Sequence, residues 1–96
     1  MGFFSSPGDK YSNIEHNFTT DQMKRLFDHL RLSSLHENEE DVVEAALIAR
    51  KGNDGKISLR QIFETLHHLK NTNKISKIDE HALMDVFVEH YKQFDK

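Results

Sequence analysis

Apolar side chains recur at the spacing of one helical face in four stretches of the chain, separated by polar turns. In the first stretch, Met23, Leu26, Phe27 and Leu30 stand at i, i+3, i+4 and i+7, which is the pattern of an amphipathic helix. The apolar positions of the other three are Val42, Val43, Ala46, Leu47 and Ala49; Leu59, Ile62, Phe63, Leu66 and Leu69; and Leu83, Val86, Phe87, Tyr91 and Phe94. The pattern predicts an all-α chain of about four helices.

Polar residues mark the starts of these helices. Thr19 and Gln22 have the spacing of a capping box, in which the side chain of each residue satisfies the backbone N–H of the other. Ser58 and Gln61 repeat this spacing before the third helix, and Ser76 begins the fourth. The sequence therefore predicts where three of the four helices start.

The starts of the first and third helices, NFTTDQMKRLFDHLR and KISLRQIFETLHHLK, are near copies that lie 39 residues apart. Phe18, Thr19, Gln22, Met23 and Leu30 align with Ile57, Ser58, Gln61, Ile62 and Leu69. Two helices could share a capping box by chance, but these two also share the flanking apolar pair and a downstream leucine. We interpret the match as an internal repeat.

The turn ahead of the third helix, RKGNDGKISLRQ over residues 50–61, resembles the calcium loop of the EF-hand superfamily, which includes calmodulin and the myosin light chains. That loop has twelve positions, with Gly at position 6 and a bidentate Glu at position 12. Placing Gly55 at position 6 puts Ile57 at position 8, where the superfamily has an apolar residue that pairs with the neighbouring loop. The upstream repeat gives a more degraded loop over residues 11–22, and the resemblance covers about residues 11–70.

In an EF-hand, a leading helix precedes the loop and a trailing helix follows it. The resemblance implies an EF-hand-like helical domain in which Phe18 and Ile57 join in a short two-stranded β bridge between the loops. We expect residues 1–17 to form an irregular arm that contains the degenerate first loop, and residues 18–96 to form the helical domain. The last helix ends in YKQFDK and is similar to a third leading helix. The chain is then either a fragment of a longer protein or a domain whose last helix packs on the pair.

Calcium takes six to eight oxygen ligands, several of them carboxylates. The loop at residues 50–61 supplies one well-placed carboxylate, Asp54, and has a cation at position 1 and Gln61 at position 12. Four cations, Arg50, Lys51, Lys56 and Arg60, against that one anion give the loop region a net charge of +3. We therefore expect no calcium or other cofactor, and interpret both position-12 glutamines as helix caps. The alternative is a calcium sensor, whose ligands would be Asp54, Lys56, Ser58 and Gln61.

The resemblance also implies a function, because EF-hand helices open into a groove that holds an amphipathic helix of a partner. There is no room for a leading helix before Tyr11, so part of that surface should be uncovered. The implied function is a light-chain-like or adaptor module that binds a helical segment, from a myosin-type or other target, without calcium. The residues expected to line the groove are Met23, Phe27, Leu30, Phe63, Leu66, Met84 and Phe87. A homodimer that pairs its own uncovered faces is a further alternative.

Composition narrows the classes of function. The net charge is −3 with histidines neutral, which is too small and of the wrong sign for nucleic-acid binding. There is no cysteine and no phosphate-binding or nucleophile motif, so we expect no enzymatic activity. No apolar run approaches the ~18 residues that span a bilayer, and we expect a cytoplasmic protein without membrane contact. The start, MGFFSS, fits the loose pattern for myristoylation of Gly2, but Phe3 and Pro7 argue against this modification.

Overall fold

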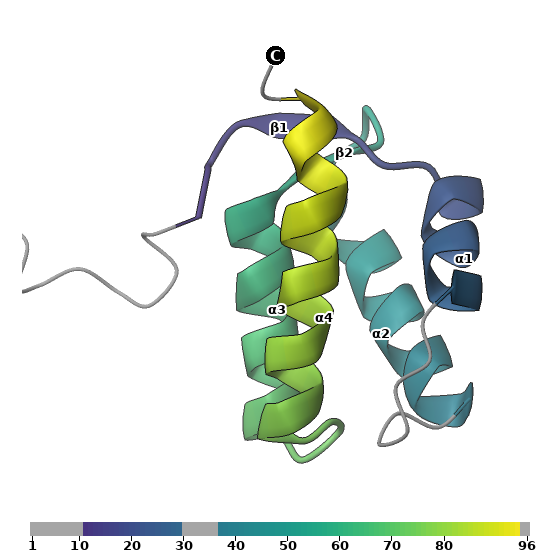
Figure 1. Cartoon of the computed structure of the whole chain (residues 1–96), viewed down its shortest axis with the longest axis vertical. Coiled ribbons are helices and arrows are strands. Elements are labelled where there is room, and N and C mark those ends of the chain that lie inside the picture. Colours follow the sequence, from purple (N-terminus) through teal and green to yellow (C-terminus); the bar gives the residue numbers. More distant parts are fainter. Residues whose placement is uncertain (1–10, 30–36, 95–96) are drawn as a thin grey trace, which may run out of the picture.

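The computed structural model describes residues 11–29 and 37–94 (Figure 1). This part of the chain forms the α-helices α1 (Thr20–His29), α2 (Glu37–Arg50), α3 (Leu59–Asn71) and α4 (Lys77–Tyr91), followed by the 3₁₀ turn η3 (Lys92–Phe94). Two short strands, β1 (Glu15–Asn17) and β2 (Lys56–Ser58), form an antiparallel sheet. The prediction of a mostly helical fold with a small two-stranded sheet is therefore confirmed.

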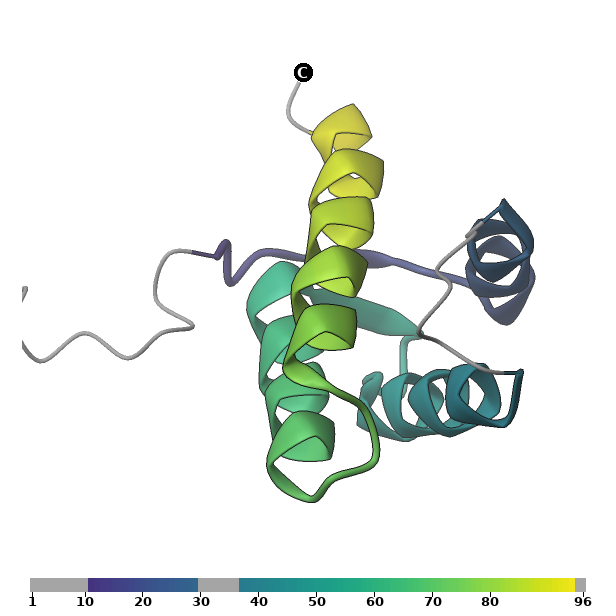
Figure 2. The same ribbon diagram turned by 60° about the horizontal axis from the view of Figure 1, so that its bottom comes forward.

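The helices are grouped around the sheet, which lies at one end of the molecule (Figure 1). α3 and α4 run side by side and in opposite directions, joined by a short turn, and the second view shows the same pairing (Figure 2). α2 packs between α3 and α1. The C-terminal end of α4 reaches the sheet, so the last described helix lies next to the first described strand.

Local hydrogen bonds set the helix starts as the sequence predicts. Ser58 and Gln61 form a complete capping box at the start of α3. The Thr19 hydroxyl accepts from the Gln22 N–H at 3.0 Å, and the Gln22 side chain accepts from the Thr19 N–H at 2.9 Å. Ser76 caps α4 through the same reciprocal pair of bonds. These caps satisfy N–H groups that have no partner within the helix.

The register of the sheet differs from the expected one. The three pairs are Glu15 with Ser58, His16 with Ile57, and Asn17 with Lys56. The expected bridge between Phe18 and Ile57 is therefore wrong, and Phe18 instead donates its N–H to the Gly55 carbonyl at 3.3 Å. A shift of two residues keeps every side chain on its own face of the sheet. His16 thereby lies over the end of α4, where its ring stacks on Phe94 with centroids 4.1 Å apart.

The segment ahead of β1 also belongs to the folded body. The Tyr11 ring packs on Phe63 with centroids 5.1 Å apart, and the Ser12 carbonyl accepts from the Arg60 N–H at 3.1 Å. The irregular arm expected over residues 1–17 therefore does not extend past residue 10, and residues 1–10 lie outside the described part. The strand and these contacts with α3 give residues 11–17 a fixed path that local sequence does not reveal.

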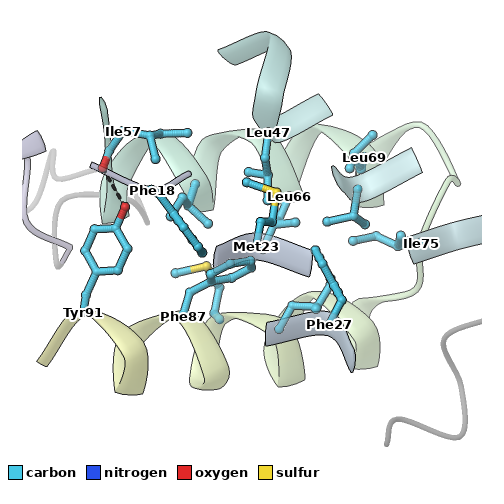
Figure 3. Close-up of a cluster of buried hydrophobic side chains, with 14 residues drawn as sticks. Phe18, Met23, Phe27, Leu47, Ile57, Leu66, Leu69, Ile75, Phe87 and Tyr91 are labelled. Carbon is cyan, nitrogen blue, oxygen red and sulfur yellow. Dashed lines mark hydrogen bonds between the residues drawn. The ribbon is translucent and has the colours of Figure 1, made fainter. Parts of the chain in front are cut away.

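One apolar core lies between α4 and the other helices (Figure 3). Its buried members are Phe18, Met23, Phe27, Val43, Leu47, Ile57, Ile62, Leu66, Leu69, Ile75, Leu83, Met84, Phe87 and Tyr91. The Phe87 ring meets both Phe18 and Phe27 edge to face, at centroid distances of 5.7 and 6.3 Å. Burying a side chain of this size stabilises a fold by roughly 1.5–3 kcal/mol. Every described helix contributes to this core.

Candidate partner-binding surface

The loop between α2 and β2 is closed by its own hydrogen bonds. Gly55 has a φ of +77°, which a residue with a side chain rarely adopts. One carboxylate oxygen of Asp54 accepts from the Lys56 N–H at 3.1 Å. The Gly52 N–H donates to the Lys56 carbonyl at 3.0 Å, and the Gly55 N–H to the Gly52 carbonyl at 2.9 Å. The asparagine–aspartate–glycine sequence thus acts as a turn in this structure.

The position-12 glutamine of this loop is fully engaged in hydrogen bonds. Its side-chain oxygen accepts from the N–H of Ser58, a residue with no exposed surface, at 2.9 Å. The side-chain nitrogen of Gln61 donates to a carboxylate oxygen of Glu15 in β1 at 3.0 Å. The oxygen that would bind a metal in an EF-hand loop is here directed at the N-terminus of α3.

These residues do not fit calcium. The Lys51 ammonium group, directly after α2, donates to the Phe18 carbonyl at 2.8 Å and places a positive charge beside the turn. Asp54 is the one carboxylate of residues 50–61, and one of its oxygens already holds the turn. Residues 11–29 and 37–94 contain no group of three or more histidine or acidic side chains arranged to hold a metal ion. A calcium site needs several carboxylate oxygens directed at one point.

The structure places the expected groove residues in the core. Met23, Leu66 and Phe87 have no exposed surface, and Phe27 and Met84 are nearly as buried. Phe63 is half-buried between Tyr11 and His67, whose rings both lie against it. Leu30 lies outside the described residues.

The face that the sequence led us to expect uncovered is occupied by α4. Phe87 fills the space against Phe18 and Phe27, and the Tyr91 hydroxyl donates to the Ile57 carbonyl at 2.7 Å (Figure 3). Burial raises the pKa of that hydroxyl, so it stays protonated as a donor. The expectation of an uncovered face is therefore wrong for this arrangement, because the last helix packs where a leading helix would.

An open groove of about 420 Å³ lies between α2 and α3, outside the core. It is lined by Ala46, Ala49, Arg50, Glu64, Thr65, His68 and Leu69. The alanines keep its floor shallow in side chains, and the Arg50 guanidinium lies 3.7 Å from the Glu64 carboxylate. Sequence reasoning did not find this groove, although the two alanines on one side of α2 were a signal for it.

A second groove lies between α1 and α4. One part, of about 460 Å³, is lined by Leu26, Asp85, Val86, Glu89 and His90. The adjoining part, of about 290 Å³, is lined by Gln22, Arg25, Leu26, His90 and Gln93. Leu26 and His90 belong to both parts, which makes the two a continuous depression along these helices.

Histidines hold α4 in place at both ends. Near its start, the His67 ring nitrogen Nδ1 lies 2.8 Å from a carboxylate oxygen of Glu80, which is 9% exposed. Near its end, the His90 ring stacks on Phe18 with centroids 4.9 Å apart. Burial lowers the pKa of His90 because the charged imidazolium loses hydration there. Sequence reasoning had assigned these histidines to the solvent.

Comparison with known proteins gives no match. No protein-family model, no curated protein and no solved structure matches this chain. In the described part of the chain, no helix is long and apolar enough to cross a membrane. The functional argument therefore depends on the geometry of the chain itself.

Replacing Gln61 with alanine tests the role of the cap. The variant leaves the buried Ser58 N–H without an acceptor, so we expect the free energy of unfolding to fall by about 1–3 kcal/mol. Urea unfolding followed by circular dichroism measures the change. The matched control is Gln22→Ala, where the hydrogen bonds are exposed and water replaces them, so that loss should be below about 1 kcal/mol. Equal losses at both positions would contradict this interpretation.

The buried His90 predicts a loss of stability in acid. The ordinary histidine pKa is 6.5, and burial lowers the pKa of His90 in the folded chain. Below the ordinary value the unfolded chain takes up this proton first, so stability falls until the folded chain is also protonated. Above that value the contribution is fully present.

We therefore expect the free energy of unfolding to fall more between about pH 7.5 and about pH 5 in the natural chain than in His90→Gln. Urea unfolding at both pH values measures the difference. Asp85, Glu89 and Arg25 line the same groove and are common to both chains, so their titration cancels in the comparison. An identical drop in the two chains would show that His90 is not the group responsible.

Proposed function

We propose that this chain is a non-catalytic, EF-hand-like module of adaptor or light-chain type that binds a helical segment of another protein without calcium. The observation that carries the proposal is the open groove between α2 and α3, which remains accessible while the core is closed. Its floor is apolar and its rim carries both charges, as expected for a surface that receives an amphipathic helix.

Several features support the EF-hand-like part of the proposal. α2, its loop and α3 form a helix–loop–helix unit, and a short sheet joins its loop to a second one upstream. Both loops end in a glutamine at the capping-box position of the next helix. A module whose loops close through these bonds has no need of a metal to hold its helices at an angle.

The groove favours close contact with a helix. Ala46 and Ala49 project little from α2, so a partner backbone can approach, while Leu69 supplies apolar surface from α3. The Arg50–Glu64 pair at the rim can exchange its mutual contact for contacts with a partner of either charge. The buried residues of the expected site, such as Met23 and Phe87, act in this proposal by fixing the walls of the groove.

Ala49→Arg tests the binding surface. Ala49 is exposed, so the larger side chain is tolerated in the fold but fills the groove. We expect binding of the partner helix to weaken by at least about tenfold, which corresponds to about 1.4 kcal/mol. The partner is first captured from native lysate with the natural chain and identified by mass. Titration calorimetry with the purified partner then measures the affinity of each variant.

The control for this experiment is Ile78→Arg, at a position on α4 that is 72% exposed and remote from the groove lining. This variant should bind the partner like the natural chain. Unchanged binding by Ala49→Arg would contradict the proposed surface. If the groove were instead filled by a second copy, light scattering on dilute natural chain would show a dimer that Ala49→Arg dissociates.

Calcium titration separates the proposal from the alternative of a calcium sensor. We expect no binding heat at micromolar calcium and no shift in the melting temperature, because the loop offers too few carboxylate oxygens and carries excess positive charge. Calorimetry with the natural chain measures this directly. Binding at micromolar affinity would favour the sensor, with Asp54 and Gln61 as ligands.

A further inference from the structure

We infer that α4 is the leading helix of the first helix–loop–helix unit, so that this unit is assembled from the two ends of the described chain. Unit one consists of α4, the segment 11–19 with β1, and α1. Unit two consists of α2, the loop with β2, and α3. Three independent features point to this arrangement, and none of them depends on partner binding.

The first feature is a second repeat in the sequence. α2 begins at Glu37 and α4 at Lys77, 40 residues later. With that shift, Val42, Val43, Ala46, Leu47 and Ile48 align with Ala82, Leu83, Val86, Phe87 and Val88, which are all apolar. The fully buried positions coincide as well, Val43 and Leu47 in α2 with Leu83 and Phe87 in α4. α4 is thus a copy of the leading helix α2, as α1 is of the trailing helix α3.

This repeat by itself is equally compatible with α4 leading a third unit farther along the chain. The packing decides between the two, because α4 lies against α3, Phe18 and Phe27 and covers the apolar side of unit one. A helix that belonged to a separate unit would not need these contacts. The remaining features show that its position corresponds to that of α2 in detail.

The second feature is a pair of matching hydrogen bonds across the sheet. Lys51, directly after α2, donates through its ammonium group to the Phe18 carbonyl at 2.8 Å. Tyr91, the last residue of α4, donates through its hydroxyl to the Ile57 carbonyl at 2.7 Å. Positions 51 and 91 differ by 40, and positions 18 and 57 differ by 39, the shifts of the two repeats. Each leading helix therefore ends with a bond to the same position of the opposite unit.

The third feature is the correspondence of the two surface grooves. The α2–α3 groove is lined by Ala46, Arg50, Glu64 and Thr65 among others, and the α4–α1 groove by Val86, His90, Arg25 and Leu26. The leading-helix residues differ by 40 and the trailing-helix residues by 39. Chance packing of an unrelated helix would not reproduce both the bonds and the groove linings. The described chain thus has an approximate twofold relation between its units.

The path of the chain agrees with this relation. In unit two, α2 runs directly into its loop at Lys51. In unit one, the end of α4 lies beside the start of the first loop, since Ser12, His16, Tyr91 and Lys92 line one small cleft. The covalent link from leading helix to loop is replaced there by packing. We infer that the order of the elements is that of a circularly permuted pair of units.

A circular permutant tests the inference with every residue of the chain retained. It joins Lys96 to Met1 and opens the chain between Asn73 and Lys74, so that α4 precedes the first loop. Residues 95–96 and 1–10 then connect Phe94 to Tyr11, and twelve residues span up to about 40 Å. We expect cooperative urea unfolding with a denaturant dependence within about a fifth of that of the natural chain.

The control is the natural order with eight glycine and serine residues inserted between Asn73 and Lys74. If this chain folds and the permutant does not, the inference is overturned. If neither folds, amide hydrogen exchange on the natural chain decides. Protection of α4 amides within about tenfold of α2 amides supports α4 as a full member of the pair, and a larger difference marks it as an appendage and overturns the inference.

Discussion

The packing of α4 on the two-stranded sheet is the contact on which the rest of this structure depends. Each strand has only three residues, and a sheet of that size is not stable alone. Phe87 covers Phe18 next to it, and the Tyr91 hydroxyl satisfies the carbonyl of Ile57 from the opposite side. The sheet in turn links the two loops and so fixes the angle at which α1 and α3 leave it. Loss of α4 would therefore release the helices as well as the strands.

The loops illustrate how a turn keeps its shape after its ion-binding groups have changed. Gln61 provides one neutral oxygen, which is sufficient for a helix cap but supplies little to a divalent cation. Asp54 holds the bend, and the ammonium group of Lys51 bonds to Phe18 in the neighbouring unit. Side-chain and backbone hydrogen bonds thus perform the structural work, and the geometry of the helix pair is maintained by contacts internal to the chain.

The division between core and surface decides what kind of binding the proposal involves. The large apolar residues that an open groove would use, Phe27 and Phe87 among them, are needed to close this core. Small residues such as Ala46 and Ala49 border the accessible depression instead. On our proposal a partner helix therefore meets a shallow, preformed groove, and its binding does not require the helices to separate. A preformed surface of this kind loses little conformational entropy on association.

The sequence by itself determined the local elements, because capping boxes and apolar periodicity depend on residues within one or two turns. Thr19, Ser58 and Ser76 mark the helix starts where the structure has them, and the repeat between residues 18–30 and 57–69 identified two related units. The register of His16 against Ile57, the burial of Met23 and Phe87, and the grooves were decided only by tertiary structure. Each of these depends on where α4 packs, more than 60 residues from Phe18 along the chain, since 18 and 87 differ by 69. Periodicity shows that a helix has an apolar face, but only the folded chain shows what covers it.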